Sequence, residues 1–409
     1  MVCSGFQGGC TCENVPLLRV DINNVEIAAC CAPRPLMLIS CTGDWTSEVP
    51  KYDAPVLQKV FDFLGVPERF RSFQDAADHN YNKNSREAAY AWLARWLQGA
   101  PDAERVPEPS FTAEPREDLA VYSEAHPRPP GVDAGALVEL LRGVASGQLG
   151  PRDAATLGTF RKLMEPALRH TLTAGWPEPG DVEAVAEHPE KVLLVRRGLA
   201  GTVELAIVRG SPGKGPSTLI VAPESEGVEA LTADGCVAVL RVRPHERREA
   251  TVKSENGETE IYATTFYRTA LSWRVQDILT CLAYLSEAES LRLVGLGEAG
   301  VPTLFAGALA PVSVTVADVS GINDADEASW TGDLAHPGIL RVGGLRTAGM
   351  LYASGKGRLV IHNTQATFDT SSIAAAFEAA GRADALTLSE ERYGKLAWEG
   401  VEKILEALK

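Results

Sequence analysis

Short apolar runs alternate with amphipathic segments along most of the chain. In the first hundred residues, Leu36–Ser40 is an unbroken apolar run, which predicts a buried strand of a parallel sheet. Val56–Gly65 and Ser85–Gly99 have apolar positions at helical spacing and end on a glycine, which predicts two helices. Arg69–Ala77 predicts a second strand. The order loop, strand, helix, strand, helix is typical of a mixed α/β unit.

Beyond residue 133 the alternation is more regular. Helices are predicted first, over 133–146 and 151–173. Strands are then predicted at 191–198, 203–210, 217–224, 236–243, 291–297, 312–321 and 358–364, and further helices at 269–285, 301–310, 371–380 and 393–408. This pattern predicts an α/β fold with a doubly wound, mostly parallel sheet and helices on both of its faces.

The stretch over residues 101–132 is rich in Pro and Glu and predicts a linker. The predicted organisation is therefore a first domain over 1–100, a linker over 101–132 and a second domain over 133–409. Two or three parallel strands need neighbours and helices on both faces, which about a hundred residues do not supply. We expect the first domain to lean on the second or on another copy of the chain, in a homodimer or larger assembly.

Composition and charge narrow the classes of partner. The chain has 409 residues, 45% hydrophobic and 23% charged, with a formal net charge of -15. No block of Lys and Arg offers a basic face, so nucleic acid and anionic membranes are not expected partners. No apolar run approaches the length of a membrane span, and the N-terminal segment does not resemble a signal peptide. A cytoplasmic location is the expectation for the chain as given.

Six of the eight cysteines lie within the first 41 residues, at positions Cys3, Cys10, Cys12, Cys30, Cys31 and Cys41. Without an export signal, the thiols are expected to stay reduced. Most are then small buried residues that behave as apolar ones. A zinc site on Cys10 and Cys12 is the alternative, although C-x-C lacks the paired C-x2-C spacing of structural zinc modules.

Two polar residues follow the predicted strands of the first domain. Asp44 stands in the sequence GDW after the first strand, and His79 follows the second strand just before an amphipathic helix. Parallel strands deliver both to one edge of the sheet, where a carboxylate can hold an imidazole in one tautomer and make it a general base. The alternatives are that Asp44 belongs to an ordinary turn and that His79 lies in a helix-cap region.

The segments FQGGCTCENVPLLRVDINNVEIAACCAPRPLMLISCTGDWT and DHNYNKNSREAAYAWLARWL resemble the C-terminal third of an α/β-hydrolase domain. More narrowly, they are similar to acetyl-xylan-esterase-like bacterial esterases. The resemblance covers residues 5–99 and implies that Asp44 is the acid and His79 the general base. Relatives that carry the preceding part of the domain can be exported proteins.

The serine nucleophile of that family is missing at its expected place. It sits in a G-x-S-x-G turn between a strand and a helix, well before the acid and the histidine. Only 43 residues precede Asp44 here, and Ser4 among them follows no strand. The chain therefore reads as though it begins inside a hydrolase domain, and we expect Met1 to be an internal start or the start of a truncated gene.

The second domain resembles a hydrolase domain that has lost its catalytic residues. RLVGLGEAGVPTLFAGAL has the strand, glycine turn and helix of the nucleophile turn, but Gly297 stands where serine is required and Glu298 follows it. LVIHNTQATFDTSS, with His362 and Asp369, resembles the segment that carries the acid, and no histidine follows. GLGEAG also fits the dinucleotide pattern G-x-G-x-x-G, but it comes late in the domain and lacks an acidic ribose partner.

These patterns predict a hydrolase that acts on small-molecule esters through Asp44 and His79, with water activated by His79 in place of a serine. A second form of this hypothesis adds a divalent metal such as zinc, held by Asp44, His79, Asp78 and Cys41, which would extend the substrates to phosphate esters. Two alternatives remain open. The chain is a non-catalytic assembly module with a pseudoenzyme domain, or it is a half-enzyme that receives its nucleophile from a second chain.

Overall fold

The computed structural model describes residues 14–100, 105–131, 133–150, 153–178, 180–188, 190–199, 201–224, 228, 234–242 and 263–391. The chain divides into two compact units. Unit 1 comprises residues 1–137 and 260–267, and unit 2 comprises residues 138–259 and 268–409. The return of segment 260–267 to unit 1 has no counterpart in the sequence prediction.

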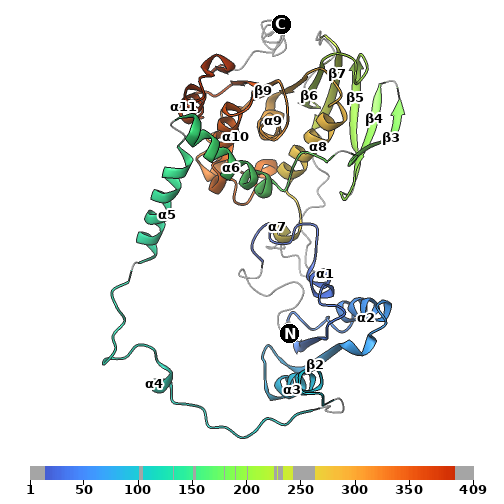
Figure 1. Ribbon diagram of the computed structural model, residues 1–409, viewed down its shortest axis with the longest axis vertical. Coiled ribbons are helices and arrows are strands. Elements are labelled where there is room, and N and C mark those ends of the chain that lie inside the picture. The colour runs from blue at the N-terminus through green and yellow to red at the C-terminus, as the bar shows by residue number, and fades with distance from the viewer. Residues whose placement is uncertain are drawn as a thin grey trace. The chain divides into compact units, whose positions relative to one another are not determined.

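Unit 1 is built on two parallel strands and the helices that follow them (Figure 1). In the described residues its sheet holds only β1 and β2, with Leu36 paired to Phe70 at the start of the ladder. The elements of this unit are α1 (Asn24–Ala29), β1 (Leu36–Gly43), α2 (Asp53–Phe63), η1 (Pro67–Arg69), β2 (Phe70–Asp78), α3 (Lys83–Leu97), α4 (Arg116–Leu119) and α7 (Ala263–Phe266), and α5 (Ala134–Leu149) crosses into unit 2.

The unbroken apolar run of β1 is explained by burial on both faces. Leu36 and Leu38 pack with α2 residues in one apolar cluster, while Met37 and Ile39 pack with Ala88 and other α3 residues in a second. Successive side chains of a strand point to opposite faces, so each face of this small sheet receives its own helix layer. The expectation that unit 1 also leans on another domain or chain stays a prediction.

The described part of segment 260–267, residues 263–267, joins unit 1 through backbone hydrogen bonds. The N–H groups of Leu17, Arg19 and Asp21 donate to the carbonyls of Thr264, Thr265 and Phe266 at 2.8, 3.0 and 2.9 Å. The guanidinium of Arg19 also lies 4.9 Å from the ring centroid of Phe266. These contacts involve residues about 250 positions apart, which is why local sequence patterns do not predict them.

Part of the predicted linker is fixed to helix α3 by ion pairs. Arg86 makes two hydrogen bonds to Glu108, of 2.6 and 2.8 Å, and Arg105 lies 2.7 Å from Glu87. The backbone N–H of Glu108 also donates to Glu87 at 3.0 Å. The hydrogen bond from the Glu108 N–H lowers the pKa of the Glu87 carboxyl group, and the hydrogen bonds from the Arg86 guanidinium lower the pKa of the Glu108 carboxyl group. The start of the segment is therefore part of unit 1.

Unit 2 contains a large mixed sheet whose described strands number nine (Figure 1). Their order is β11-β10-β9-β8-β6-β7-β5-β4-β3, with parallel pairing from β11 to β7 and antiparallel pairing from β7 to β3. The strands are β3 (Val182–His188), β4 (Lys191–Arg196), β5 (Val203–Arg209), β6 (Ser217–Pro223), β7 (Cys236–Val242), β8 (Leu291–Gly295), β9 (Val314–Asp318), β10 (Arg358–His362) and β11 (Leu386–Leu388).

The helices of unit 2 are α6 (Ala154–Leu172), α8 (Ala270–Tyr284), α9 (Gly300–Ala308), α10 (Gly344–Ala353) and α11 (Ser371–Ala379), with short turns η2 (Gly297–Ala299), η3 (Glu327–Ser329), η4 (Gly332–Leu334), η5 (Leu340–Val342) and η6 (Ala383–Ala385). The predicted fold class, α/β with a mostly parallel sheet, is confirmed. β3, β11 and α10 were not predicted, and the helix expected over 393–408 lies outside the described residues.

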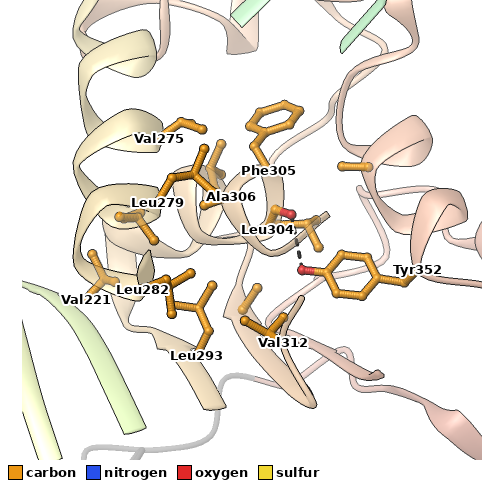
Figure 2. Packing of buried hydrophobic residues seen from close by; sticks show 14 of the residues in the cluster. Val221, Val275, Leu279, Leu282, Leu293, Leu304, Phe305, Ala306, Val312 and Tyr352 are labelled. Carbon is orange, nitrogen blue, oxygen red and sulfur yellow. Dashed lines mark hydrogen bonds between the residues drawn. The ribbon is translucent and has the colours of Figure 1, made fainter. Parts of the chain in front are cut away.

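The core of unit 2 lies on both faces of this sheet. Leu219 and Val221 of β6 pack into the larger cluster, to which α6, α8, α9, α10 and α11 contribute, and Ile220 and Ala222 pack into a second cluster of mostly strand residues. Figure 2 shows Val275, Leu279 and Leu282 of α8 directed toward α9 in the larger cluster, and the Tyr352 hydroxyl 3.4 Å from the Leu304 carbonyl. No helix among the described residues has the length and apolar character needed to cross a membrane.

Candidate active site

The two predicted site residues follow neighbouring strands of unit 1. Asp44 comes directly after β1, and His79 comes directly after β2. The strands are parallel, and Gly43 and Asp78 are paired at their ends, so both loops leave the same edge of the sheet. A Cβ atom on Gly43 would lie 3.0 Å from the Asp78 Cα, so glycine permits this close approach. The carboxyl edge of a parallel sheet is a common place for a site.

Asp44 and His79 are in direct contact. The His79 Nδ1 lies 3.0 Å from the Asp44 Oδ2. The side chain of Asp44 is only 3% exposed, whereas that of His79 is 59% exposed. A buried carboxylate thus supports an imidazole that reaches solvent. A carboxylate only accepts hydrogen bonds, so the contact requires the proton on Nδ1 and leaves the Nε2 lone pair available.

Two neighbours of Asp44 in sequence complete the arrangement. The indole ring of Trp45 packs against the imidazole of His79, with ring centroids 4.3 Å apart and an angle of 36° between the planes. Thr46 donates to the Asp44 Oδ1 twice, from its hydroxyl at 2.5 Å and from its backbone N–H at 2.7 Å. Each of the two carboxylate oxygens of Asp44 therefore has its own partner.

The hydrogen bonds decide the charge of Asp44. Burial acts to raise the pKa of its carboxyl group, but the hydrogen bonds from Thr46 and His79 outweigh this effect and hold the pKa below the ordinary value of an aspartate. Asp44 is therefore ionised at neutral pH. An ionised carboxylate accepts the hydrogen bond from the His79 Nδ1–H and holds the ring in one orientation.

The loop that carries His79 is held at both ends by asparagines. Asn82 caps helix α3, since its Oδ1 accepts from the Ser85 N–H at 3.2 Å, and its own N–H donates to Asn80 Oδ1 at 2.8 Å. The Asn82 side chain also donates to Asp75 of β2 at 2.5 Å. The sequence HNYNKNS thus builds a short, internally bonded turn, because Asn favours caps and turns.

The predicted metal ligands do not come together in the same way. The Cys41 side chain is buried, and its thiol lies 3.5 Å from the Asn80 carbonyl. The Asp78 side chain is exposed. No group of three His, Cys, Asp or Glu side chains suited to a metal ion occurs among the residues that the structure describes. These residues do not fit a zinc centre, and Cys3, Cys10 and Cys12 lie outside the described part of the chain.

Trp45 and Thr46 are site residues that the sequence analysis missed. Both stand in the GDWT motif, directly after Asp44. The usable signal was the threonine two residues after Asp44, since Asp side chains accept from the backbone two positions on. Contacts of a lone tryptophan, in contrast, have no local signature.

The carboxyl edge of the sheet in unit 2 has a sharp turn between a strand and a helix, but no nucleophilic side chain at that turn. Between β8 and α9 the chain turns sharply at Gly297, whose φ is +53°. A glycine there offers no nucleophile, and Glu298 beside it is exposed. His362 is fully buried at the end of β10, while the exposed Asp369 accepts from the Ser371 N–H at 2.9 Å, near the start of α11.

Packing explains two glycines of the GLGEAG motif, Gly295 and Gly300. A Cβ atom on Gly300 would lie 1.8 Å from the carbonyl oxygen of Asp318 at the end of β9. A Cβ atom on Gly295 would lie 2.4 Å from the Thr303 hydroxyl of α9. Both glycines thus allow α9 to approach the sheet, a role that requires no dinucleotide.

Comparison with known proteins gave matches only among solved structures. No family model matches the chain, and no curated protein matches it. A putative acetyl xylan esterase from Bacteroides fragilis is 9% identical, with 68% of this chain and 86% of that chain covered and a TM-score of 0.41. A glucuronoyl esterase from Sporotrichum thermophile is 14% identical (58% and 77% covered, TM-score 0.39). Acetyl xylan esterase 1 from Thermoanaerobacterium sp. is 13% identical (59% and 93% covered, TM-score 0.34). These names include the class that residues 5–99 resemble.

Proposed function

We propose that the chain hydrolyses carboxyl esters, with His79 as the general base and Asp44 as the residue that orients and supports it. The observation that carries the proposal is the 3.0 Å contact between a buried carboxylate and an exposed imidazole. A carboxylate that is ionised at neutral pH and bonded to Nδ1 is the arrangement that prepares Nε2 to accept a proton.

The proposed reaction uses water as the nucleophile. The Nε2 atom of His79 accepts a proton from water while the water oxygen attacks the ester carbonyl carbon. The tetrahedral oxyanion then collapses, the bond to the alkoxide breaks, and the imidazolium returns its proton to the leaving oxygen. The products are a carboxylic acid and an alcohol. General base catalysis of this kind contributes roughly 10²- to 10⁴-fold in rate, so activated esters are the expected substrates.

The test must separate the pair from a lone imidazole, because an exposed histidine can by itself react slowly with activated esters. Hydrolysis of p-nitrophenyl acetate is measured for the wild type, Asp44→Asn and the control His126→Gln, which alters an exposed histidine of unit 1. We expect Asp44→Asn to lower kcat/KM by about a hundredfold or more and His126→Gln to leave it unchanged. Equal rates for the wild type and Asp44→Asn would refute the proposal.

A second candidate function is a non-catalytic assembly module. The observation that favours it is Gly297, which keeps the turn of a nucleophile without the nucleophile. In this case the wild type hydrolyses esters no faster than Asp44→Asn. In the remaining form of the catalytic proposal, a second copy of the chain or a partner chain supplies a serine to His79. If a second copy supplies it, the hydrolysis rate of the purified chain rises more than linearly with protein concentration.

A further inference from the structure

We propose that Thr46 is the positioning residue of the site, which sets the tautomer of His79 through Asp44. This inference rests on the proposed function and adds to it a residue that need not touch substrate. Thr46 is 2% exposed, whereas the imidazole that it would control is mostly exposed. Its effect must therefore pass through the carboxylate between them.

The hydrogen bonds define a chain from the strand to the imidazole. The Cys41 N–H at the end of β1 donates to the Thr46 Oγ1 at 2.8 Å. The Thr46 hydroxyl donates in turn to the Asp44 Oδ1 at 2.5 Å, and the Asp44 Oδ2 faces the His79 Nδ1. Each contact fixes the next one, so the orientation of the carboxylate is set by the backbone of β1.

The direction of the hydroxyl proton follows from competition between two acceptors. The Thr46 Oγ1 lies 3.4 Å from the Cys41 carbonyl but 2.5 Å from the Asp44 carboxylate. A hydroxyl has one proton, and hydrogen bonds to an ionised oxygen are shorter and stronger than bonds to a neutral one. The proton therefore goes to Asp44, and the oxygen remains free to accept from Cys41.

The hydroxyl and the backbone N–H of Thr46 make different contributions to the orientation of Asp44. Both reach the Asp44 Oδ1, and the N–H is present whatever residue stands at position 46. One donor alone leaves the carboxylate free to rotate about its bond to Cβ, whereas a second donor tied to β1 fixes the plane of the carboxylate. Loss of the hydroxyl should thus loosen the contact to His79 without abolishing it.

The test uses chain labelled with ¹⁵N-histidine, in which ring nitrogen resonances report the tautomer directly. The signals of His79, one of seven histidines, are assigned by their loss in His79→Gln. The compared variants are Thr46→Val and Thr46→Ser, with Thr42→Val as the matched control on an exposed threonine of β1. Spectra are recorded above the histidine titration range, and kcat and KM are measured on the same samples.

We expect the wild type, Thr46→Ser and Thr42→Val to hold His79 in the Nδ1–H tautomer. In Thr46→Val the Nε2–H population should rise several-fold, with kcat lower by on the order of ten- to a hundredfold and KM little changed. If Thr46→Val does not fold, Thr46→Ala gives the same comparison. An unchanged tautomer in the valine or alanine variant would overturn the proposal, as would a change in Thr46→Ser equal to that in Thr46→Val. The tautomer is read without substrate, so a wild type that holds the Nδ1–H form but hydrolyses no ester refutes the proposed function alone.

Discussion

The carboxyl edges of the two sheets differ in what they keep. In unit 1, Asp44 and His79 are in contact at 3.0 Å after neighbouring parallel strands. In unit 2, strand β8, the turn at Gly297 (φ +53°) and helix α9 are present, but a glycine offers no nucleophile at that turn. Packing alone can thus require a sharp connection between a strand and a helix, whereas the chemistry depends on a few side chains.

Gly300 shows why packing requires this connection between β8 and α9. Its Cα lies so close to the Asp318 carbonyl that no other residue fits without a shift of the backbone. The turn is therefore required by the approach of α9 to the sheet, whether or not Gly297 is replaced by a nucleophile. In unit 1, by contrast, the buried Asp44 carboxylate would be costly without His79 and Thr46, so packing alone does not explain it.

The largest expected effect concerns the small core that supports Asp44 and His79. Phe61 of α2 is fully buried beside Phe70, with ring centroids 5.6 Å apart. We expect Phe61→Ala to lower the free energy of unfolding of unit 1 by about 3–5 kcal/mol, with faster hydrogen exchange in β1 and β2 and loss of ester hydrolysis. Phe63→Ala, which alters a residue 88% exposed on the same helix, is the control. Unchanged exchange in Phe61→Ala would contradict the described core.

The second effect tests the turn of unit 2. Gly300→Ala places a Cβ atom against the backbone of β9. We expect it to lower the free energy of unfolding of unit 2 by about 1–3 kcal/mol. Gly158→Ala on α6, where nothing lies within 4 Å, should be neutral or slightly stabilising because alanine favours a helix. Neither change should alter the ester hydrolysis rate of the folded chain, and a fall in rate would assign unit 2 a part in the reaction.

The third effect is the pH dependence of stability that Asp44 supplies. Its folded-state pKa is lowered, so its contribution is complete above the ordinary aspartate pKa of about 3.9 and is lost as the pH falls through the lowered value. We expect Asp44→Asn to cost about 1–2 kcal/mol at pH 7 and the cost to shrink as the pH approaches 2. Urea unfolding at several pH values measures this difference. A cost that grows in acid would contradict the assigned direction.

The smallest effect on ester hydrolysis is expected from placing a hydroxyl at the turn of unit 2. Gly297→Ser should cost about 1–2 kcal/mol, because a non-glycine residue is strained at positive φ. It should add no ester hydrolysis, since His362 is fully buried and Asp369 bonds to Ser371. Labelling with a fluorophosphonate checks the outcome. Covalent modification at position 297 in that variant would show that unit 2 retains working partners.

Local pattern was sufficient to predict the elements that carry the site. The apolar run Leu36–Ser40 falls inside β1, because burial on both faces leaves a clear signal, and the predicted strand Arg69–Ala77 overlaps the partly exposed β2. The proximity of Asp44 and His79 then follows from the parallel pairing of two adjacent strands. What the sequence could show was the order and direction of elements.

The remainder depends on contacts that no local pattern encodes. β3 was missed because none of its residues is fully buried and its inward positions carry only valine and alanine, and α10 because it begins at a pair of glycines with positive φ, Gly343 and Gly344. The bonds from Glu108 to α3 and from Thr264 to Leu17 join distant segments. The bond from the Thr46 N–H could be suspected from its place two residues after Asp44, but the contact of the Thr46 hydroxyl with β1 and with Asp44 appears only in the structure.

The most direct test of the account is the rate of ester hydrolysis by His79→Gln, in which Asp44, Trp45 and Thr46 are all retained. The substrate is p-nitrophenyl acetate, and the protein is shown to be folded by hydrogen exchange in β1 and β2. The account predicts a loss of at least about a hundredfold in kcat/KM relative to the wild type. A variant that hydrolyses the ester at the rate of the wild type would contradict it.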